Sequence, residues 1–236
     1  MVDAFPFLDP PRSIPTYPIR APLVRWLRAE AVRAHEERGR YRLLDVGCGL
    51  KPYEPLFARY VSEYVGVDPV ENPRADLKGS IEDLPVDDSS FDVVLCVQVL
   101  EHCSEPATGV RELRRVTAPG GRVLASTHGV MTYHPAPTDY WRWTHAGLAK
   151  LFTDNATWAS LRVSPGSGTT ACVGMMVSMN LDLFLRRARM GLIARPLVSG
   201  INRFAELVDR RSSRLRDPAQ GGTLFANFHV VAEVAP

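Results

Sequence analysis

The stretch that decides the fold is residues 41–68, YRLLDVGCGLKPYEPLFARYVSEYVGVD. Two short runs rich in Val and Leu, residues 41–46 and 64–68, flank a Gly-x-Gly turn and a helix candidate at 53–61. Near-continuous apolar runs of this length are typical of parallel strands that are buried on both faces. A glycine turn after the first strand lets the backbone approach a ligand closely. Residues 41–68 therefore predict the first strand–helix–strand unit of an open α/β sheet.

The alternation of strands and helices continues along the chain. In order, the expected elements are a strand at 91–99, a helix at 106–117, a strand at 121–127, a helix at 145–152 after Thr144 as N-cap, and strands at 160–164 and 223–234. Strands that alternate with helices predict a doubly wound, mostly parallel sheet. The last segment alternates apolar and polar residues well enough to predict an antiparallel closing strand.

Three segments flank or interrupt this sheet. Residues 1–22 contain six prolines, so we expect an extended arm there and no helix. An amphipathic helix is predicted at 23–38 and ends at Gly39. Residues 23–236 are expected to form a single domain with a helical insertion at 171–216, before the last strand. This insertion is interpreted as an active-site lid, a membrane-facing element or a structural buttress, and the sequence leaves these three alternatives open.

Composition excludes several classes of protein. Apolar residues make up 45% of the 236 residues and charged residues 23%, which are typical of globular domains. No apolar run approaches the ~20 residues that span a bilayer. The chain starts without the basic and apolar segments of a secretory signal, so a cytoplasmic location is expected. The four cysteines show no CxxC spacing and are expected to be reduced thiols.

Charge is unevenly distributed along the chain. The net charge is only +2, yet residues 181–216 contain nine arginines and only three acidic residues. This segment could be a solvated helical face, or a surface that contacts an anionic substrate or weakly contacts lipid headgroups. Because aromatic residues are not interleaved with the arginines, nucleic acid is not expected as a partner.

The glycine turn and one aspartate point to a nucleoside ligand. Asp68 ends the second predicted strand, 19 residues after Gly49, where a carboxylate can accept hydrogen bonds from both ribose hydroxyls. The third glycine of a dinucleotide fingerprint would fall at Pro52, which has no amide to donate to a pyrophosphate, so NAD and FAD are disfavoured. Asp45 either stabilises the turn or anchors a ligand ammonium group. A ligand with a ribose, an amino acid and no phosphate is S-adenosylmethionine.

Four successive motifs resemble a known family. LLDVGCG at 43–49, GVD at 66–68, GSIEDLPVDDSSFDVVLCVQVLEH at 79–102 and LRRVTAPGGRVLAST at 113–127 are similar to the motifs of class I S-adenosylmethionine-dependent methyltransferases of type 11. The resemblance implies a Rossmann-like, seven-stranded α/β fold with an antiparallel last strand. GCGLKPY at 47–53 and DYWRWT at 139–144 further resemble a subset found in bacterial sugar, polysaccharide and natural-product pathways.

The resemblance also assigns cofactor-binding residues. Around the methionine moiety it places Asp45, Gly47, Cys48 and Gly49, and on the ribose it places Asp68. Ser80, Ile81 and Glu82 fall where the adenine is bound, although the family usually has an Asp where this chain has Ser80. Gln98 lies where the family lines the sulfonium pocket, and His102 lies at the wall of the site.

The acceptor side is expected just after the strand at 121–127. Attack by a hydroxyl needs a base, so the candidate catalytic residues are His128, His134 and Asp139. Aromatic and polar side chains in the same stretch are candidates for the substrate wall, namely Tyr133, Tyr140, Trp141, Arg142 and Trp143. His128, His134 and Asp139 do not have the spacing of a known metal motif, so no metal is expected.

These inferences predict a bacterial enzyme that uses S-adenosylmethionine, yields S-adenosylhomocysteine and O-methylates a sugar or small natural product. The alternatives are N- or C-methylation of a similar acceptor, a peripheral membrane enzyme acting on a lipid-linked substrate, and a non-catalytic module that binds the same cofactor. The partner is expected to be a small-molecule acceptor, whereas the oligomeric state is not predicted.

Overall fold

The computed structural model describes residues 7–236, and this part of the chain divides into two compact units. The sheet unit contains residues 26–128, 132–164 and 228–236. The helical unit contains 129–131, 165–227 and the described part of 1–25.

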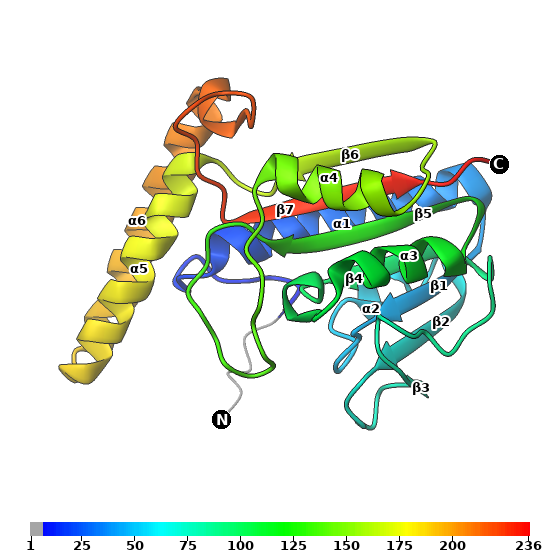
Figure 1. Ribbon diagram of the computed structural model, residues 1–236. Coiled ribbons are helices and arrows are strands. Elements are labelled where there is room, and N and C mark those ends of the chain that lie inside the picture. Colours follow the sequence, from blue (N-terminus) through cyan, green and yellow to red (C-terminus); the bar gives the residue numbers. More distant parts are fainter. Residues whose placement is uncertain (1–6) are drawn as a thin grey trace. The chain divides into compact units, whose positions relative to one another are not determined.

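The sheet unit is built on seven strands (Figure 1). They are β1 (Tyr41–Val46), β2 (Val61–Asp68), β3 (Leu77–Lys78), β4 (Phe91–Val97), β5 (Thr117–His128), β6 (Ser160–Pro165) and β7 (Asn227–Glu233). The spatial order is β3-β2-β1-β4-β5-β7-β6. β1 pairs in parallel with β2 and β4, and β4 pairs in parallel with β5. Since β1 lies between two strands that follow it in the chain, the strand order reverses there, and ligands bind at such a switch point.

The last strand runs antiparallel, as predicted. The amide of Gly120 donates to the carbonyl of Ala235 at 2.8 Å, and the amide of Val234 donates to the carbonyl of Gly121 at 2.9 Å. Toward the other end of β5, the amide of Gly129 donates to the carbonyl of Ala226 at 3.0 Å. As the residue numbers rise along β5, the residue numbers of the partners along β7 fall. This confirms the antiparallel closing strand.

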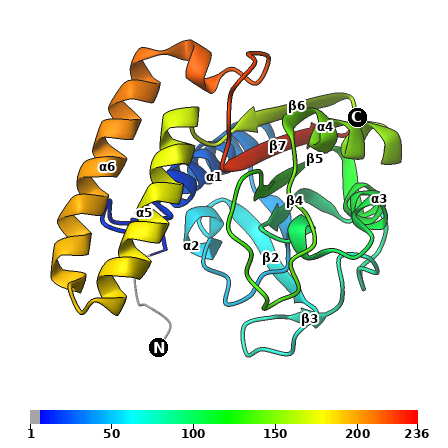
Figure 2. The same ribbon diagram turned by 60° about the vertical axis from the view of Figure 1, so that its left-hand side comes forward.

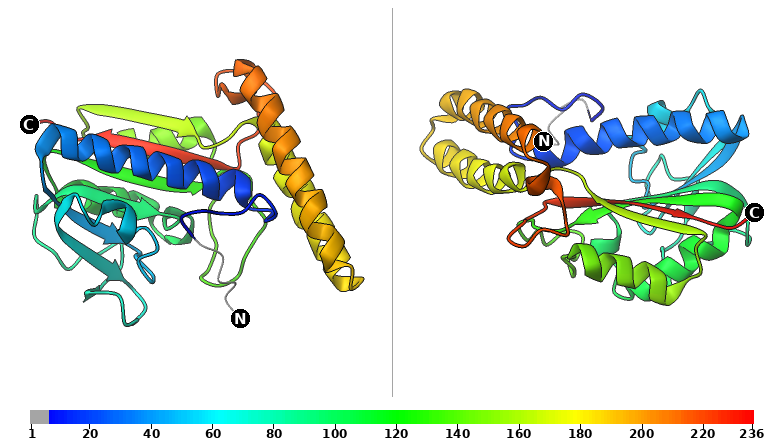
Figure 3. Two further views of the ribbon diagram at one scale, coloured as in Figure 1. Left: turned by 180° about the vertical axis from the view of Figure 1, so that it is seen from behind. Right: turned by 90° about the horizontal axis from the view of Figure 1, so that it is seen from above.

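Helices cover both faces of the sheet (Figure 3). One face carries α1 (Tyr17–Arg38), whose Trp26 stacks on His229 of β7 with ring centroids 4.5 Å apart. The other face carries α3 (Pro106–Val116) and α4 (His145–Asn155). The Thr144 side chain accepts a hydrogen bond from the Gly147 amide at 3.0 Å, so Thr144 is the predicted N-cap of α4. The doubly wound arrangement is therefore confirmed.

Two helix predictions need correction. Helix α1 begins at Tyr17, so the extended arm predicted for residues 1–22 is wrong from residue 17 onward. Pro18 lies in the first turn, where the missing N–H would have no helical partner, and Pro22 removes only one further bond. Residues 1–6 of the arm lie outside the described residues. The helix predicted at 53–61 is the shorter α2 (Glu54–Phe57), because β2 starts at residue 61, three residues earlier than predicted.

The helical unit contains two long helices, α5 (Thr169–Arg187) and α6 (Gly191–Arg211), followed by the short helix η2 (Ser213–Arg216). The two long helices lie side by side along their length (Figure 2). A Cβ at Gly174 would lie 3.2 Å from Ile201 and 3.4 Å from Ala205, so the helices approach closely there. The predicted pair of helices in this segment is present. Among the helices of residues 7–236, none combines the length and apolar character that a bilayer crossing requires.

Candidate functional site

A cavity of about 620 Å³ opens in the sheet unit at the carboxyl ends of β1, β2 and β4. Seven of the predicted site residues on the cofactor side line it, namely Gly47, Asp68, Ser80, Ile81, Glu82, Gln98 and His102. The cavity is also lined by Tyr140 from the predicted substrate wall and by six residues that were not predicted, Pro69, Val70, Val99, Cys103, Ser104 and Pro137. The strand order reverses at β1, so this is where an open α/β sheet is expected to bind a ligand.

Gly47 makes the turn after β1 and forms part of the cavity wall. Its φ of +67° is in the left-handed region, and its amide donates to the Val67 carbonyl at 2.8 Å. A Cβ at this position would lie 2.4 Å from a methyl group of Val99. The backbone conformation and the space therefore both require glycine here.

Asp68 ends β2 with its carboxylate on the cavity. One oxygen, Oδ2, accepts from the Gly49 amide at 2.8 Å, and Oδ1 accepts from the Val70 amide at 2.9 Å. A carboxylate can accept about four hydrogen bonds, so both oxygens retain acceptor capacity. The hydrogen bond from the Gly49 amide orients the glycine turn and the Asp68 carboxylate relative to each other. Gly49 thus supports Asp68 and is not itself among the cavity-lining residues.

Asp45 and Cys48 are buried beside the glycine turn. The Asp45 side chain is buried, and its Oδ2 accepts from the Tyr64 hydroxyl at 2.7 Å. Burial raises the pKa of Asp45 to about 7. Burial likewise raises the pKa of the Cys48 thiol, to about 12. Neither side chain is among the residues that line the cavity. The contact of Asp45 with a ligand ammonium group therefore stays a prediction.

The loop after β3 supplies the predicted adenine side of the cavity. The Glu82 carboxylate accepts from the Ser104 hydroxyl at 3.0 Å and from the Glu105 amide at 2.9 Å. Glu105 is the residue immediately before α3, so Glu82 ties this loop to the start of that helix. Ile81 is buried, and a Cβ at Gly109 of α3 would lie 3.3 Å from its side chain. An apolar surface and an acidic group thus lie together on this wall.

Gln98 follows β4 in an unusual backbone conformation. Its φ is +57°, which is uncommon for a residue other than glycine and is often found at functional sites. The Gln98 amide donates to the Ser126 carbonyl at 2.7 Å, and its side-chain nitrogen donates to the Ser126 hydroxyl at 3.2 Å. Because Ser126 lies on β5, these bonds hold Gln98 at the junction of β4 and β5.

Three histidines form a cluster beside the cavity. The His102 ring lies 5.0 Å from the His134 ring, and the His134 ring lies 6.1 Å from the His128 ring. His102 lines the cavity, and its Nδ1 lies 2.9 Å from the Thr138 carbonyl. The imidazoles therefore lead from the cavity to the end of β5. The predicted bases His128 and His134 thus lie next to His102, which was predicted to belong to the cofactor side.

Glu101 is a buried carboxyl group that was not among the predicted site residues. The Thr127 hydroxyl donates to its Oε2 at 2.8 Å, and its Oε1 lies 3.4 Å from Nε2 of His128. Glu101 is fully buried, which raises its pKa to about 7. Burial also lowers the pKa of His128 to about 3, so this imidazole is neutral at pH 7. The sequence signal was a charged residue four positions after the end of the apolar strand β4.

Asp139 is held by Arg142. Both of its carboxylate oxygens accept from the Arg142 guanidinium, which also donates to the Thr132 carbonyl at 3.0 Å. These bonds hold the pKa of Asp139 well below its usual range. The Asp139 carboxylate also accepts from the His134 amide at 3.2 Å and lies 4.0 Å from His134 Nε2. Asp139 thus positions His134 and is a poor proton acceptor itself.

The aromatic residues of the same loop take three different positions. Trp141 and Trp143 stack with centroids 5.6 Å apart, and the Trp141 indole donates to the Cys103 carbonyl at 2.7 Å. The Tyr140 side chain lines the cavity, whereas Tyr133 is exposed. The two tryptophans therefore dock the loop on the sheet unit, and Tyr140 is the aromatic residue that can meet a ligand. Within residues 7–236, no group of three or more His, Cys, Asp or Glu side chains could hold a metal ion.

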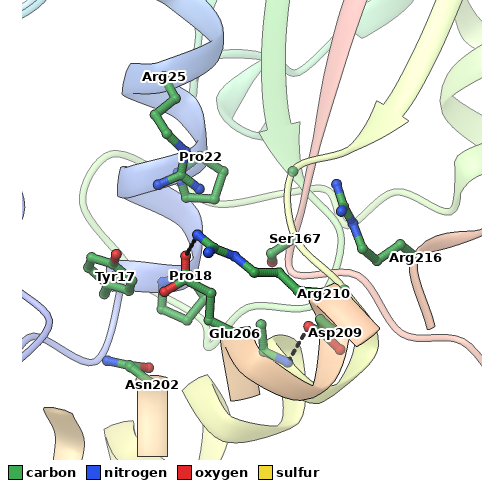
Figure 4. Close-up of a pocket in the computed structure, with 13 residues that line it drawn as sticks. Tyr17, Pro18, Pro22, Arg25, Ser167, Asn202, Glu206, Asp209, Arg210 and Arg216 are labelled. Carbon is green, nitrogen blue, oxygen red and sulfur yellow. Dashed lines mark hydrogen bonds and ion pairs between the residues drawn. The ribbon is translucent and has the colours of Figure 1, made fainter. Parts of the chain in front are cut away.

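A smaller cavity of about 100 Å³ lies in the helical unit (Figure 4). Its two carboxylates are already engaged, because Glu206 pairs with Arg12 and Arg210, and Asp209 accepts from two amides at the start of α5. Two of its arginines, Arg25 and Arg216, make no ion pair with any described residue. The carboxylates thus hold this unit together, and the surplus charge around the cavity is positive.

The sheet unit contains a segment that is similar to known methyltransferases. Residues 44–125 match the family described as "Methyltransferase domain". The uncharacterized methyltransferase YcgJ of Bacillus subtilis is 34% identical over 113 residues, which are 41% of this chain and 44% of YcgJ. The malonyl-[acyl-carrier protein] O-methyltransferase of Erwinia pyrifoliae is 41% identical over 96 residues, 36% of this chain and 37% of that protein. The match thus spans less than half the length of either relative.

Solved structures share the fold at low sequence identity. The [4+2]-cyclase SpnF superposes with a TM-score of 0.54 at 18% identity, covering 88% of this chain and 81% of SpnF. The structure of YcgJ superposes with a TM-score of 0.51 at 19% identity, covering 90% of this chain and 99% of YcgJ. At this identity the likeness concerns the fold alone.

Proposed function

We propose that the protein is an S-adenosylmethionine-dependent enzyme that methylates a hydroxyl oxygen of a sugar or small natural product, since residues 44–125 match the methyltransferase domain family. The observation that carries this proposal is the continuity between the cavity and the three imidazoles, since His102 belongs to both. A cofactor cavity without adjacent bases would leave the acceptor hydroxyl protonated.

The residues of the cavity fit S-adenosylmethionine. Gly47 lets the backbone itself form part of the cavity wall, the Asp68 carboxylate retains acceptor capacity for ribose hydroxyls, and Ile81 offers an apolar surface for a base. Pro52 cannot donate to a pyrophosphate, so the chain disfavours a dinucleotide. When bound, S-adenosylmethionine supplies a methyl group on a sulfonium, which is already activated for in-line displacement.

His134 is the residue best suited to accept the hydroxyl proton of the acceptor. Its side chain retains about a third of its exposure, whereas His128 is buried. A base works best when its pKa lies near the working pH. The pKa of His128 is lowered to about 3, which makes it a weak base, and Asp139 is paired with Arg142. In this scheme His134 removes the proton and Asp139 positions His134. The neutral His128 beside Glu101 forms the floor of the acceptor site.

The first test measures cofactor binding and turnover separately. Calorimetry with S-adenosylhomocysteine should show binding, and NAD should show none. Screening of candidate sugar and natural-product acceptors by mass spectrometry with methyl-labelled cofactor should then identify a product with one added methyl group. Binding of NAD, or no binding of either sulfur nucleoside, would refute the cofactor assignment.

The second test concerns the base. His134→Ala should lower kcat by ~10²–10⁴ with cofactor affinity nearly unchanged, because a general base acts on the acceptor. His35→Ala is the matched control, since His35 lies in the last turn of α1 and its Nδ1 lies 2.9 Å from the Gly39 carbonyl. The control should keep the wild-type rate. If His134→Ala does so as well and His128→Ala does not, the base is His128.

Two alternatives make different predictions for the same variants. A nitrogen acceptor with a free lone pair needs less of a base, so N-methylation would survive the loss of both His128 and His134. A module that only binds the cofactor would yield no methylated product with any acceptor. The [4+2]-cyclase SpnF has a similar fold, so the product must be identified directly. A lipid-linked hydroxyl is a further candidate acceptor, favoured by the exposed apolar side chains of α5 and α6.

A further inference from the structure

Large apolar side chains are exposed along the hairpin that α5 and α6 form with the turn between them. Ten of the seventeen most exposed large apolar residues of the described chain lie in this hairpin, although it contains only residues 169–211. They are Val173, Val177, Leu183, Phe184, Met190, Leu192, Ile193, Leu197, Phe204 and Leu207. Exposed apolar side chains that are concentrated on one part of a protein mark an interaction site, whereas singly scattered ones are normal.

The exposure is greatest at the hairpin tip, residues 183–197, with the sequence LFLRRARMGLIARPL. Leu192 is 91% exposed and Phe184 is 68% exposed. This tip contains four arginines and no acidic residue. Asp182, just before the tip, forms an ion pair with Arg186, whose Nε lies 2.6 Å from the Asp182 carboxylate. Apolar side chains and unopposed positive charge thus share one exposed segment.

The turn at the tip has an arginine in a backbone conformation that glycine adopts with less strain. Arg189 has a φ of +59°, in the left-handed region that favours glycine. The Met190 amide donates to the Leu185 carbonyl at 2.7 Å and the Arg189 amide donates to the Arg186 carbonyl at 3.1 Å, which is the Schellman pattern that ends α5. The outermost turn of the hairpin therefore carries a charged side chain despite its conformational cost.

Charge along the whole hairpin is also mainly unpaired. Of the nine arginines in residues 181–216, Arg186 and Arg210 form the ion pairs seen within residues 7–236. The three acidic residues of the segment are occupied, because Asp182 and Glu206 hold arginines and Asp209 accepts from the amides of α5. A partner that covers this surface must therefore bring negative charge with it.

We propose that the hairpin tip binds the surface of an anionic lipid bilayer, with Leu192 and Phe184 inserted among the headgroups and the arginines on the phosphates. Helices with an arginine-rich face and exposed Leu or Phe lie at such interfaces. A second copy of the chain is a poor occupant, because it would place like charges against each other. The proposal does not depend on the methyl transfer, so lipid binding and catalysis can fail independently.

The test is flotation of the full chain with vesicles of two compositions. Vesicles of one part phosphatidylglycerol to two parts phosphatidylcholine should bind the protein, and vesicles of phosphatidylcholine alone should bind it much less. Each basic residue near an anionic surface contributes ~1 kcal/mol, so Arg187→Gln/Arg195→Gln should weaken binding about thirtyfold. Phe184→Ser/Leu192→Ser should weaken it at least ~tenfold through lost apolar burial.

Matched controls place the effect at the tip. Arg28→Gln/Lys78→Gln removes the same charge from the sheet unit and should leave vesicle binding unchanged. Phe204→Ser/Leu207→Ser removes exposed apolar residues of α6 outside the tip and should have little effect. The proposal is overturned if the wild-type chain does not float with anionic vesicles, or if a control weakens flotation as much as the matching tip variant. It is also overturned if light scattering shows a dimer that Phe184→Ser/Leu192→Ser dissociates, because the occupant is then a second copy.

Discussion

Replacing Glu101 by Gln should make the protein more stable at alkaline pH. The Glu101 carboxyl is fully buried, and its pKa is raised from 4.5 to about 7. The native state therefore keeps this group protonated to a higher pH than the unfolded chain does. As the pH rises from 5 to 8 the unfolded chain loses the proton first, so the free energy of unfolding falls. A glutamine at this position has no proton to lose and can still accept from the Thr127 hydroxyl.

The size of the effect follows from that pKa. A carboxyl group that titrates near pH 7 in the native state, in place of 4.5, lowers the free energy of unfolding by roughly 3 kcal/mol at alkaline pH. Most of this loss, roughly 2 to 3 kcal/mol, falls between pH 5 and 8. Glu101→Gln should remove that part of the pH dependence. Asp45 keeps some dependence in the variant, because burial raises its pKa to about 7 as well.

Urea denaturation at several pH values measures this difference. Tryptophan fluorescence reports on the sheet unit, since all four tryptophans lie in it, namely Trp26, Trp141, Trp143 and Trp158. Glu36→Gln, at an exposed position of α1, is the control and should keep the wild-type pH dependence. If Glu101→Gln also keeps it, the native carboxyl is ionised, and it would then have to be balanced by a protonated His128.

Three further predictions concern the cofactor side and the fold. Asp68→Ala should weaken S-adenosylhomocysteine binding by ~1.5–3 kcal/mol through lost hydrogen bonds to a charged group, and an unchanged dissociation constant in calorimetry would place the ribose elsewhere. Gly47→Ala should destabilise the protein by ~1–3 kcal/mol because its Cβ meets Val99, and Val99→Ala should restore part of the loss in thermal unfolding. Thr144→Ala should cost ~1 kcal/mol by removing the cap on the Gly147 amide, which equal denaturation midpoints of variant and wild type would contradict.

The order of strands and helices could be predicted from the sequence because it depends on local periodicity. The apolar runs of β1, β4 and β5 and the amphipathic pattern of α3 each lie within one short segment. The helix cap at Thr144 is equally local. The start of α1 was missed for a local reason, since proline in the first turns of a helix resembles proline in an extended arm.

The role of each charged side chain could be predicted less well, because it depends on residues far away in the chain. The sequence places Asp45 beside the glycine turn but does not reveal that its carboxylate turns to the Tyr64 hydroxyl. Nor does it reveal that Glu101 is buried. The amides of Tyr140 and Trp141 both donate to the Glu101 carbonyl, at 2.8 and 3.2 Å, so a loop some forty residues later closes over it.

The loop at residues 132–144 holds the acceptor side of the site but not the cofactor side. The two sides can therefore be changed separately. The proposed cofactor groups, Gly47 and Asp68, are held by β1 and β2 through bonds that involve no residue of the loop. The acceptor groups depend on it, because the Trp143 amide donates to the His128 carbonyl at 3.0 Å and Asp139 holds His134. Loosening the loop should therefore impair proton removal and acceptor binding while the cofactor still binds. The two sides meet at His102 and at Pro137 and Tyr140 of the loop, which all line the cavity. His102 also lies against His134, so a change at His102 should affect both sides.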